Sequence, residues 1–237
     1  MVCRTAVATL LAILLVVPGE QVICQDGGLS IILNGSYTTT SEIFPNPNAS
    51  DPFARSQSFL VEGTFGYGVE FKYRIAQSLV AIGASVEYLQ ASVDRSVGVA
   101  FRQGVQVQDG YRVVPLELTG YFIIPFSTRT FQVFIGGGAG MYIGHRTYML
   151  AGVEAPAVDS EPGFGIHVVA GLVFGFNEWF SITGEMKFRD LQFSSSNVFP
   201  VSRIDYGGTV LNVSSEPFES KIHTDGVVFQ IGAAFTI

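Results

Sequence analysis

The sequence predicts an all-β protein, an eight-stranded antiparallel up-and-down transmembrane β-barrel, and three observations lead to this fold class. The chain of 237 residues has a mean hydropathy of +0.38 with only 14% charged residues, which is typical of a membrane protein. Beyond residue 24, no apolar run reaches the roughly 18 residues that a membrane-spanning helix needs. The apolar residues instead alternate with polar or small ones, which is the period of a strand with two unlike faces.

The first 24 residues have the pattern of a secretory signal peptide. Arg4 precedes a largely apolar run over residues 5–17, and a Pro-Gly pair ends this run. The run is too short to cross a bilayer as a helix. We therefore expect a signal peptide over residues 1–24 and one outer-membrane β-barrel domain over residues 25–237, with a lipoprotein alternative left open by Cys24. Both cysteines lie in the leader, so we expect no disulfide in the mature chain.

Eight stretches of the chain show strand alternation. They lie near residues 29–40, 59–74, 80–88, 114–124, 131–146, 164–176, 180–190 and 227–237. In the second stretch, for example, Val69 and Phe71 share one face, while Glu70 and Lys72 share the other. Three short connections cover residues 75–78, 126–130 and 177–179, and four long ones cover 41–58, 94–112, 147–163 and 194–224. Short turns on one side and long loops on the other are typical of bacterial barrels.

The apolar faces should look outward, toward lipid. They carry no Asp, Glu, Lys or Arg within the strands, and only Asp190 and Asp225 stand at strand ends. A charge facing lipid near the midplane costs about 2–4 kcal/mol, so this absence favours a membrane barrel over a soluble one with an apolar cavity. Aromatic residues should form two girdles at headgroup depth. The girdle at the turns would contain Tyr73, Phe126, Phe131, Phe176, Trp179, Phe180 and Phe235, and that at the loops Tyr37, Phe59, Tyr88, Phe164 and Phe188.

The opposite faces should place a balanced set of charges in the lumen. The predicted network contains Glu62, Glu70, Lys72, Arg74, Glu87, Glu117, Arg146, Glu185, Lys187 and Arg189. Because side chains just fill the interior of an eight-stranded barrel, these charges must pair or be hydrated. We interpret them as a polar plug that closes the lumen. The alternative is a path for ions or small solutes.

The last predicted strand alternates apolar residues on one face: Val227, Phe229, Ile231, Ala233 and Phe235. In this overall pattern the mature chain resembles the small eight-stranded outer-membrane barrels of the OmpA/OmpX type, the outer membrane protein beta-barrel domain family. The resemblance implies a location in the bacterial outer membrane. It also implies that the barrel insertion machinery recognises the last strand, although the terminal Ile237 departs from the family's usual aromatic residue.

The expected role is structural or surface-interacting, with the external loops as a binding surface. The alternatives are a narrow OmpW-like channel for small amphipathic compounds and, less favoured, an enzyme that modifies lipid A. Three histidines are available to such an enzyme, but no spacing joins His145, His167 or His223 to a common acid, so we expect no catalysis. We expect a monomer that contacts outer-membrane lipid and lipopolysaccharide, and an extracellular ligand or protein at the loops. The sequence shows no metal or cofactor motif, and its net charge of -7 does not favour nucleic acid.

Overall fold

The computed structural model describes residues 27–97, 104–128, 130–224 and 226–237. Among these residues, no helix is long and apolar enough to cross a membrane. The elements in chain order are β1 (Gly28–Phe44), α2 (Pro52–Ser56), β2 (Phe59–Arg74), β3 (Val80–Val97), β4 (Val105–Ile123), β5 (Phe131–Leu150), β6 (Val153–Ala155), β7 (Ala157–Glu161), β8 (Gly163–Gly175), β9 (Phe180–Arg189), β10 (Leu191–Asn197), β11 (Arg203–Tyr206), β12 (Thr209–Asn212), β13 (Phe218–Thr224) and β14 (Val227–Thr236).

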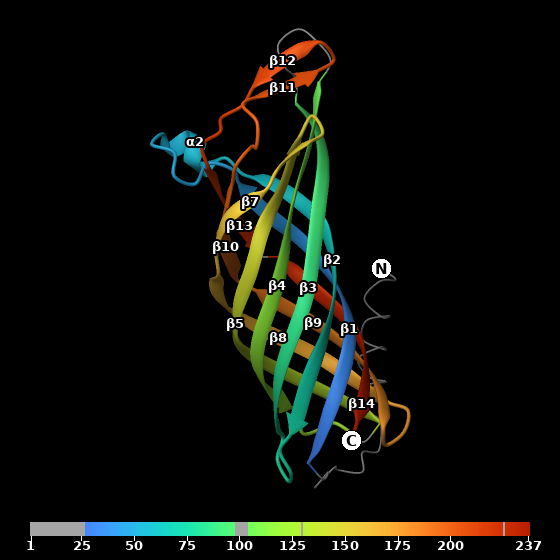
Figure 1. The fold of residues 1–237 in the computed structure, drawn as a ribbon. Helices are drawn as coiled ribbons and strands as arrows, with labels where there is room; N and C mark the ends of the chain where they lie inside the picture. Colours follow the sequence, from blue (N-terminus) through green and yellow to red (C-terminus); the bar gives the residue numbers. More distant parts are fainter. Residues whose placement is uncertain (1–26, 98–103, 129, 225) are drawn as a thin grey trace, which may run out of the picture.

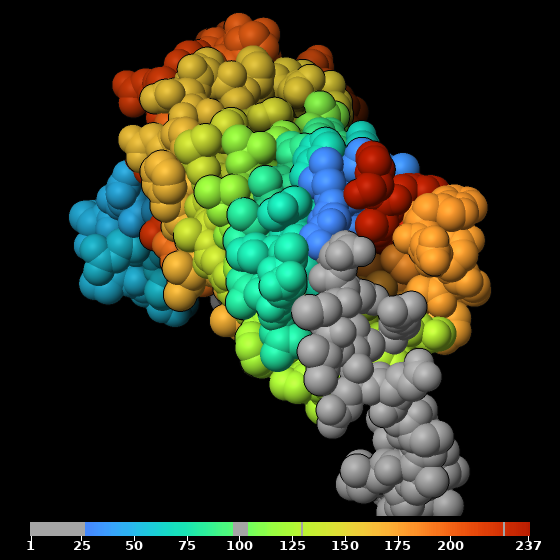
Figure 2. All heavy atoms as spheres, turned by 90° about the horizontal axis from the view of Figure 1, so that it is seen from below, coloured from blue at the N-terminus to red at the C-terminus, as the bar shows by residue number. Residues whose placement is uncertain are grey.

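Eight strands close into an antiparallel ring in the order β1-β2-β3-β4-β5-β8-β9-β14, as predicted (Figure 1). The ring is closed by β14 and β1, which pair from Ser30↔Thr236 to Thr38↔Val228. Seen from below, the first and last strands lie side by side at the surface (Figure 2). Closure satisfies backbone groups that an open sheet would leave exposed, which is the condition for spanning a membrane with strands.

An apolar belt surrounds the end of the barrel that carries the short turns. Each of the eight ring strands contributes a large exposed hydrophobic residue to it: Leu33, Tyr67, Ile82, Leu118, Ile135, Ile166, Ile182 and Ile231. Most inward neighbours of these residues are small, polar or charged, and the large apolar exceptions are Ile32 and Phe134.

Toward the loop end, the two faces of the wall exchange their character. Val61 and Tyr111 are fully buried inside this part of the barrel, whereas Gln90 and Arg112 are exposed on its outside. On β2 the alternation changes phase at Gly63, whose φ of 71° lies in the left-handed region that favours glycine. The barrel therefore has a polar interior within the membrane, and beyond it a layer of apolar side chains inside and polar side chains outside.

Strands occupy much of the four regions that were predicted to be long loops. Residues 94–112 contain the end of β3 and the beginning of β4, and residues 194–224 contain most of β10 and all of β11 to β13. The prediction of irregular loops was wrong there because apolar and polar residues continue to alternate, with Val105 and Val107 inside and Gln106 outside. The β11–β12 hairpin lies at the far external end in Figure 1, and Ile204 from it packs in an apolar cluster with buried Ala155 and Phe199.

Candidate functional site

The lumen nearest the turns contains an ion cluster around Lys72. Its Nζ atom lies 3.3 Å from Glu185 Oε1 and 3.5 Å from Glu70 Oε1. The same nitrogen lies 3.9 Å from the centre of the Tyr121 ring, and the Tyr121 hydroxyl donates to Glu70 Oε1 at 2.7 Å. Buried Phe134, the one apolar inward residue that breaks the alternation of its predicted strand, packs edge-on against Tyr121. These contacts join β2, β4, β5 and β9 across the lumen.

A second ion cluster lies further along the lumen. Arg189 places Nε 2.7 Å from Glu117 Oε1 and Nη2 2.8 Å from Glu87 Oε1. Lys187 Nζ contacts the same two carboxylates, at 2.8 Å from Glu117 Oε2 and 3.6 Å from Glu87 Oε1. Gln230 Nε2 donates to Glu87 Oε1 at 2.6 Å. Two cations and two anions are therefore neutralised together, which compensates for their burial.

An apolar layer follows the second ion cluster, and its buried residues come from β1 to β5, β10 and β13. We call it the apolar seal; it consists of Ile43, Val61, Leu89, Ala91, Tyr111, Val113, Tyr142, Leu191, Phe193 and Ile222. Along β4, its members Tyr111 and Val113 lie between the inward carboxylates Asp109 and Glu117. The polar hydroxyl of Tyr111 bonds to Ser41 and Thr64, so it exposes no unpaired group in the layer.

A third ion cluster lies on the external side of the seal. Asp109 is fully buried and accepts two hydrogen bonds from Arg146, at 2.8 Å from Nε and 2.5 Å from Nη2. Arg95 Nη2 lies 3.0 Å from the same carboxylate, and Arg146 Nη1 donates to Ser220 Oγ at 2.6 Å. Asp109 and Arg95 were missed in the sequence because residues 94–112 were assigned to a loop. The alternation of Val105, Val107 and Asp109 was the signal that could have found them.

Nine of the ten predicted network residues face the lumen, and the structure divides eight of them among the three ion clusters. Arg74 lies at the turn end, where Nη1 contacts Gln132 Oε1 at 3.5 Å. The placement of Glu62 inside was wrong, since its side chain is exposed. The phase change at Gly63 turns Val61 inward in its place.

The predicted girdle residues are partly or fully exposed on the outer wall, with one correction. At the turn end, Phe180 packs against Phe176, Trp179 and Phe235, with ring centres 5.5–5.8 Å apart. Phe59 was assigned to the girdle near the loops, and this was wrong. It packs against the apolar seal, and the guanidinium carbon of Arg95 lies 3.6 Å from the centre of its ring. Phe59 precedes the phase change on β2 and therefore faces inward, like Val61.

One group of side chains resembles a hydrolytic triad in composition. His167 Nε2 lies 2.9 Å from Thr119 Oγ1, and His167 Nδ1 lies 3.9 Å from Glu117 Oε1. The second distance is too long for a hydrogen bond, and Glu117 is already held by the second ion cluster. All three side chains are buried in the lumen, so a substrate has no access to them. We interpret the group as structural.

The other two histidines lie elsewhere. His223 packs against Phe44 with ring centres 4.9 Å apart and the ring planes tilted by 49°, and His145 lines a cavity on the outer wall. Within the described residues, no group of three or more His, Cys, Asp or Glu side chains is placed to hold a metal ion.

Comparison with known proteins supports the fold. No protein-family model and no curated protein sequence matches the chain. Among solved structures, the outer membrane protein OprG from Pseudomonas aeruginosa is similar with a TM-score of 0.55 at 16% identity, covering 92% of this chain and 98% of OprG. Ail of Yersinia pestis, solved with the heparin analogue sucrose octasulfate, has a TM-score of 0.47 at 12% identity, covering 90% of this chain and 100% of Ail. Neisserial surface protein A has a TM-score of 0.47 at 10% identity, covering 89% of this chain and 99% of its own length.

The chain thus has the fold of a small bacterial outer-membrane β-barrel. Its apolar belt runs across all eight ring strands and carries no charged side chain. This belt independently indicates that the barrel spans a membrane. The protein is therefore a transmembrane β-barrel.

Proposed function

We propose that the protein is a closed outer-membrane barrel whose folded external end is a surface for interaction with a partner. The observation that carries this proposal is the apolar seal between two ion clusters. A solute that enters from either end meets a layer whose buried members are at most 6% exposed. An ion in this layer would lose its hydration without gaining polar partners, which makes the layer a barrier to conduction.

The external end supports an interaction role because it is built of strands and strongly charged. The ring strands continue beyond the belt, and β7, β10 and β13 extend the wall there. Exposed carboxylates predominate on this end: Asp51, Glu62, Asp94, Glu154, Asp159, Glu161, Asp205, Glu216 and Glu219. The exposed arginines among the described residues of this end are Arg55, Arg112 and Arg203. A partner with a basic surface would be favoured by this charge distribution.

Two measurements test the proposal against its alternatives. Liposomes that contain the refolded protein should take up small amphipathic solutes no faster than empty liposomes. Uptake that rises with the amount of protein would support the narrow OmpW-like channel instead. Mass spectrometry of lipid A from cells with and without the protein should give the same species, and a changed acyl pattern would support the enzyme.

The partner surface is tested by the salt dependence of binding. A cationic peptide such as oligolysine should bind the micelle-embedded barrel at low ionic strength, and an oligoglutamate of equal length should not. Neutralising Asp205, Glu216 and Glu219 together to their amides should weaken binding of the cationic peptide. If neutralisation leaves that binding unchanged, the external carboxylates are not the interaction surface.

A further inference from the structure

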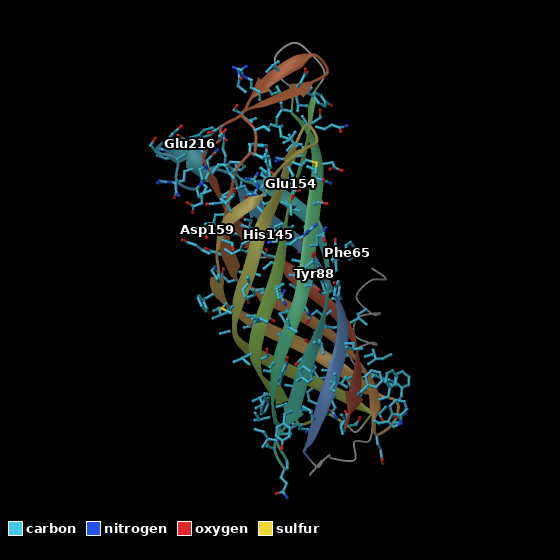
Figure 3. All side chains as sticks on the ribbon, viewed as in Figure 1. Phe65, Tyr88, His145, Glu154, Asp159 and Glu216 are labelled. Carbon is cyan, nitrogen blue, oxygen red and sulfur yellow. The ribbon has the colours of Figure 1, made fainter. Side chains whose placement is uncertain are left out.

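A cavity of about 450 Å³ opens on the outer wall where β7 separates from β5. Up to the pair Tyr142↔Gly163, β5 is paired with β8. Beyond that point β7, which precedes β8 in the chain, pairs with β10 instead of with β5. The space between β5 and β7 is left unfilled. Figure 3 shows His145, Glu154 and Asp159 together on this part of the wall. The cavity is lined by Arg112, His145, Arg146, Thr147, Glu154 and residues 156–160.

The walls of the cavity carry charges of opposite sign. Arg112 and His145 are directly opposite each other on β4 and β5, and Arg112 is exposed and free of the buried ion clusters described above. Glu154 and Asp159 line other sides, and both are exposed. Burial, followed by the positive charge of Arg112, lowers the pKa of His145 against the opposing charge of Glu154, which favours the neutral imidazole. A neutral imidazole can donate one hydrogen bond to an anion that Arg112 binds.

The height of the cavity relative to the membrane identifies where its ligand comes from. On β5, Ile143 is exposed as the last large residue of the apolar belt, and His145 is the next residue on the same face. Phe65 on β2 and Tyr88 on β3 lie slightly lower than His145 in Figure 3. Aromatic residues of barrels mark headgroup depth, so the cavity faces the polar layer of the outer leaflet.

We propose that this cavity binds the headgroup of an outer-leaflet lipid that carries a phosphate and a primary amine. Arg112 and His145 hold the phosphate, and Glu154 and Asp159 accept hydrogen bonds from the ammonium group. The mixed charge of the cavity distinguishes this ligand from a purely anionic headgroup, which the two carboxylates would repel. The site depends on the position of the barrel in the membrane and does not require the lumen to be closed.

The test uses the full refolded protein in detergent micelles with equal amounts of three phospholipids that share the same acyl chains. Phosphatidylethanolamine has the phosphate and the primary amine, phosphatidylcholine has a quaternary amine that cannot donate, and phosphatidylglycerol has no amine. Native mass spectrometry should show phosphatidylethanolamine retained about tenfold more than the other two, the size of one charge-assisted hydrogen bond. Binding of phosphatidylethanolamine should also raise the pKa of His145, measured by NMR, because a bound phosphate stabilises the imidazolium.

Variants separate the two halves of the site. Arg112→Gln should reduce retention of phosphatidylethanolamine about tenfold, through loss of the phosphate contact. The double variant Glu154→Gln with Asp159→Asn should instead abolish the preference for the primary amine and bring the three lipids to similar retention. The matched control is Arg203→Gln on the β11–β12 hairpin, which removes an exposed arginine outside the cavity and should change nothing. Unheated gel mobility confirms that each variant is folded.

The contrary outcomes are distinct. Equal retention of the three lipids by the unmutated protein, or an equal loss with Arg203→Gln, would overturn the site. If soluble O-phosphoethanolamine displaced the lipid at the lipid's own concentration, the cavity would be a site for a free solute, and the assignment to a membrane lipid would be overturned. The lipid should not displace a cationic peptide from the external end. The lipid site and the proposed interaction surface are therefore tested separately.

Discussion

Lys72 on β2 and Glu185 on β9 meet across the lumen, with Nζ 3.3 Å from Oε1, although 113 residues separate them in the chain. Because both side chains are largely removed from water, loss of one partner leaves the other charge without compensation. The single changes Lys72→Met and Glu185→Gln should each lower the free energy of unfolding by more than half of the loss caused by the double change. A double-mutant cycle of urea unfolding in lipid vesicles should give a coupling of about 0.5–3 kcal/mol.

The matched control for this cycle pairs Glu185→Gln with Arg95→Gln, which lies in the third ion cluster on the far side of the apolar seal. These two changes share no partner and should add. Coupling of equal size in both cycles would mean that the clusters are not separate.

The Asp109–Arg146 pair should be the most sensitive charge contact of the external half. Asp109→Asn leaves the buried Arg146 guanidinium with a neutral partner and should lower the free energy of unfolding by about 3–5 kcal/mol. Glu62→Gln, an exposed carboxylate on the outer wall, should change it by less than about 0.5 kcal/mol. Similar effects of the two changes in urea unfolding would contradict the placement of Glu62 outside and Asp109 inside.

The boundary of the apolar belt can be located with arginine. Val168 and Leu60 are similarly exposed, at 56% and 54%, but Val168 lies within the belt and Leu60 lies beyond it. Val168→Arg should destabilise the folded barrel by about 2–4 kcal/mol if its site is near the midplane, whereas Leu60→Arg should cost less than about 1 kcal/mol. Equal costs, measured by unfolding in vesicles, would mean that the membrane covers a different part of the wall.

The phase change on β2 depends on the backbone of Gly63. A Cβ atom there would have room, since the nearest atom is 3.6 Å away on Tyr37, but the φ of 71° disfavours any L side chain. Gly63→Ala should therefore destabilise the barrel by about 1–2 kcal/mol through backbone strain alone. Gly35→Ala is the control, because its Cβ would meet nothing within 4 Å and its φ is not positive. An equal effect at both positions in the same unfolding assay would rule out strain as the cause.

The membrane half of the barrel could be predicted from sequence because one rule governs it. Lipid excludes charge from the outer face, so the alternation of residues such as Phe71 and Lys72 identifies both faces and the strand. The rule fails beyond the belt, where water is outside. There Val61 points inward and Glu62 outward, and the same alternation has the opposite meaning.

The partners within the lumen could not be predicted from sequence for a different reason. Which inward residues meet depends on the register and tilt of eight strands, and a strand pattern alone does not state either. The sequence does not rank Lys72, Arg146 and Lys187 as partners of Glu185. In the structure, Arg146 pairs with Asp109 and Lys187 with Glu117, so Lys72 alone of the three contacts Glu185.

The central claim is that the apolar seal closes the lumen, and single-channel recording in planar bilayers tests it most directly. The unmutated protein should give no stable conductance, because ions cannot cross the seal. A variant with Leu89→Ala and Phe193→Ala, which opens the seal but leaves the ion clusters intact, should show more frequent conducting events. Large, stable, porin-like conductance from the unmutated protein would contradict the closed lumen.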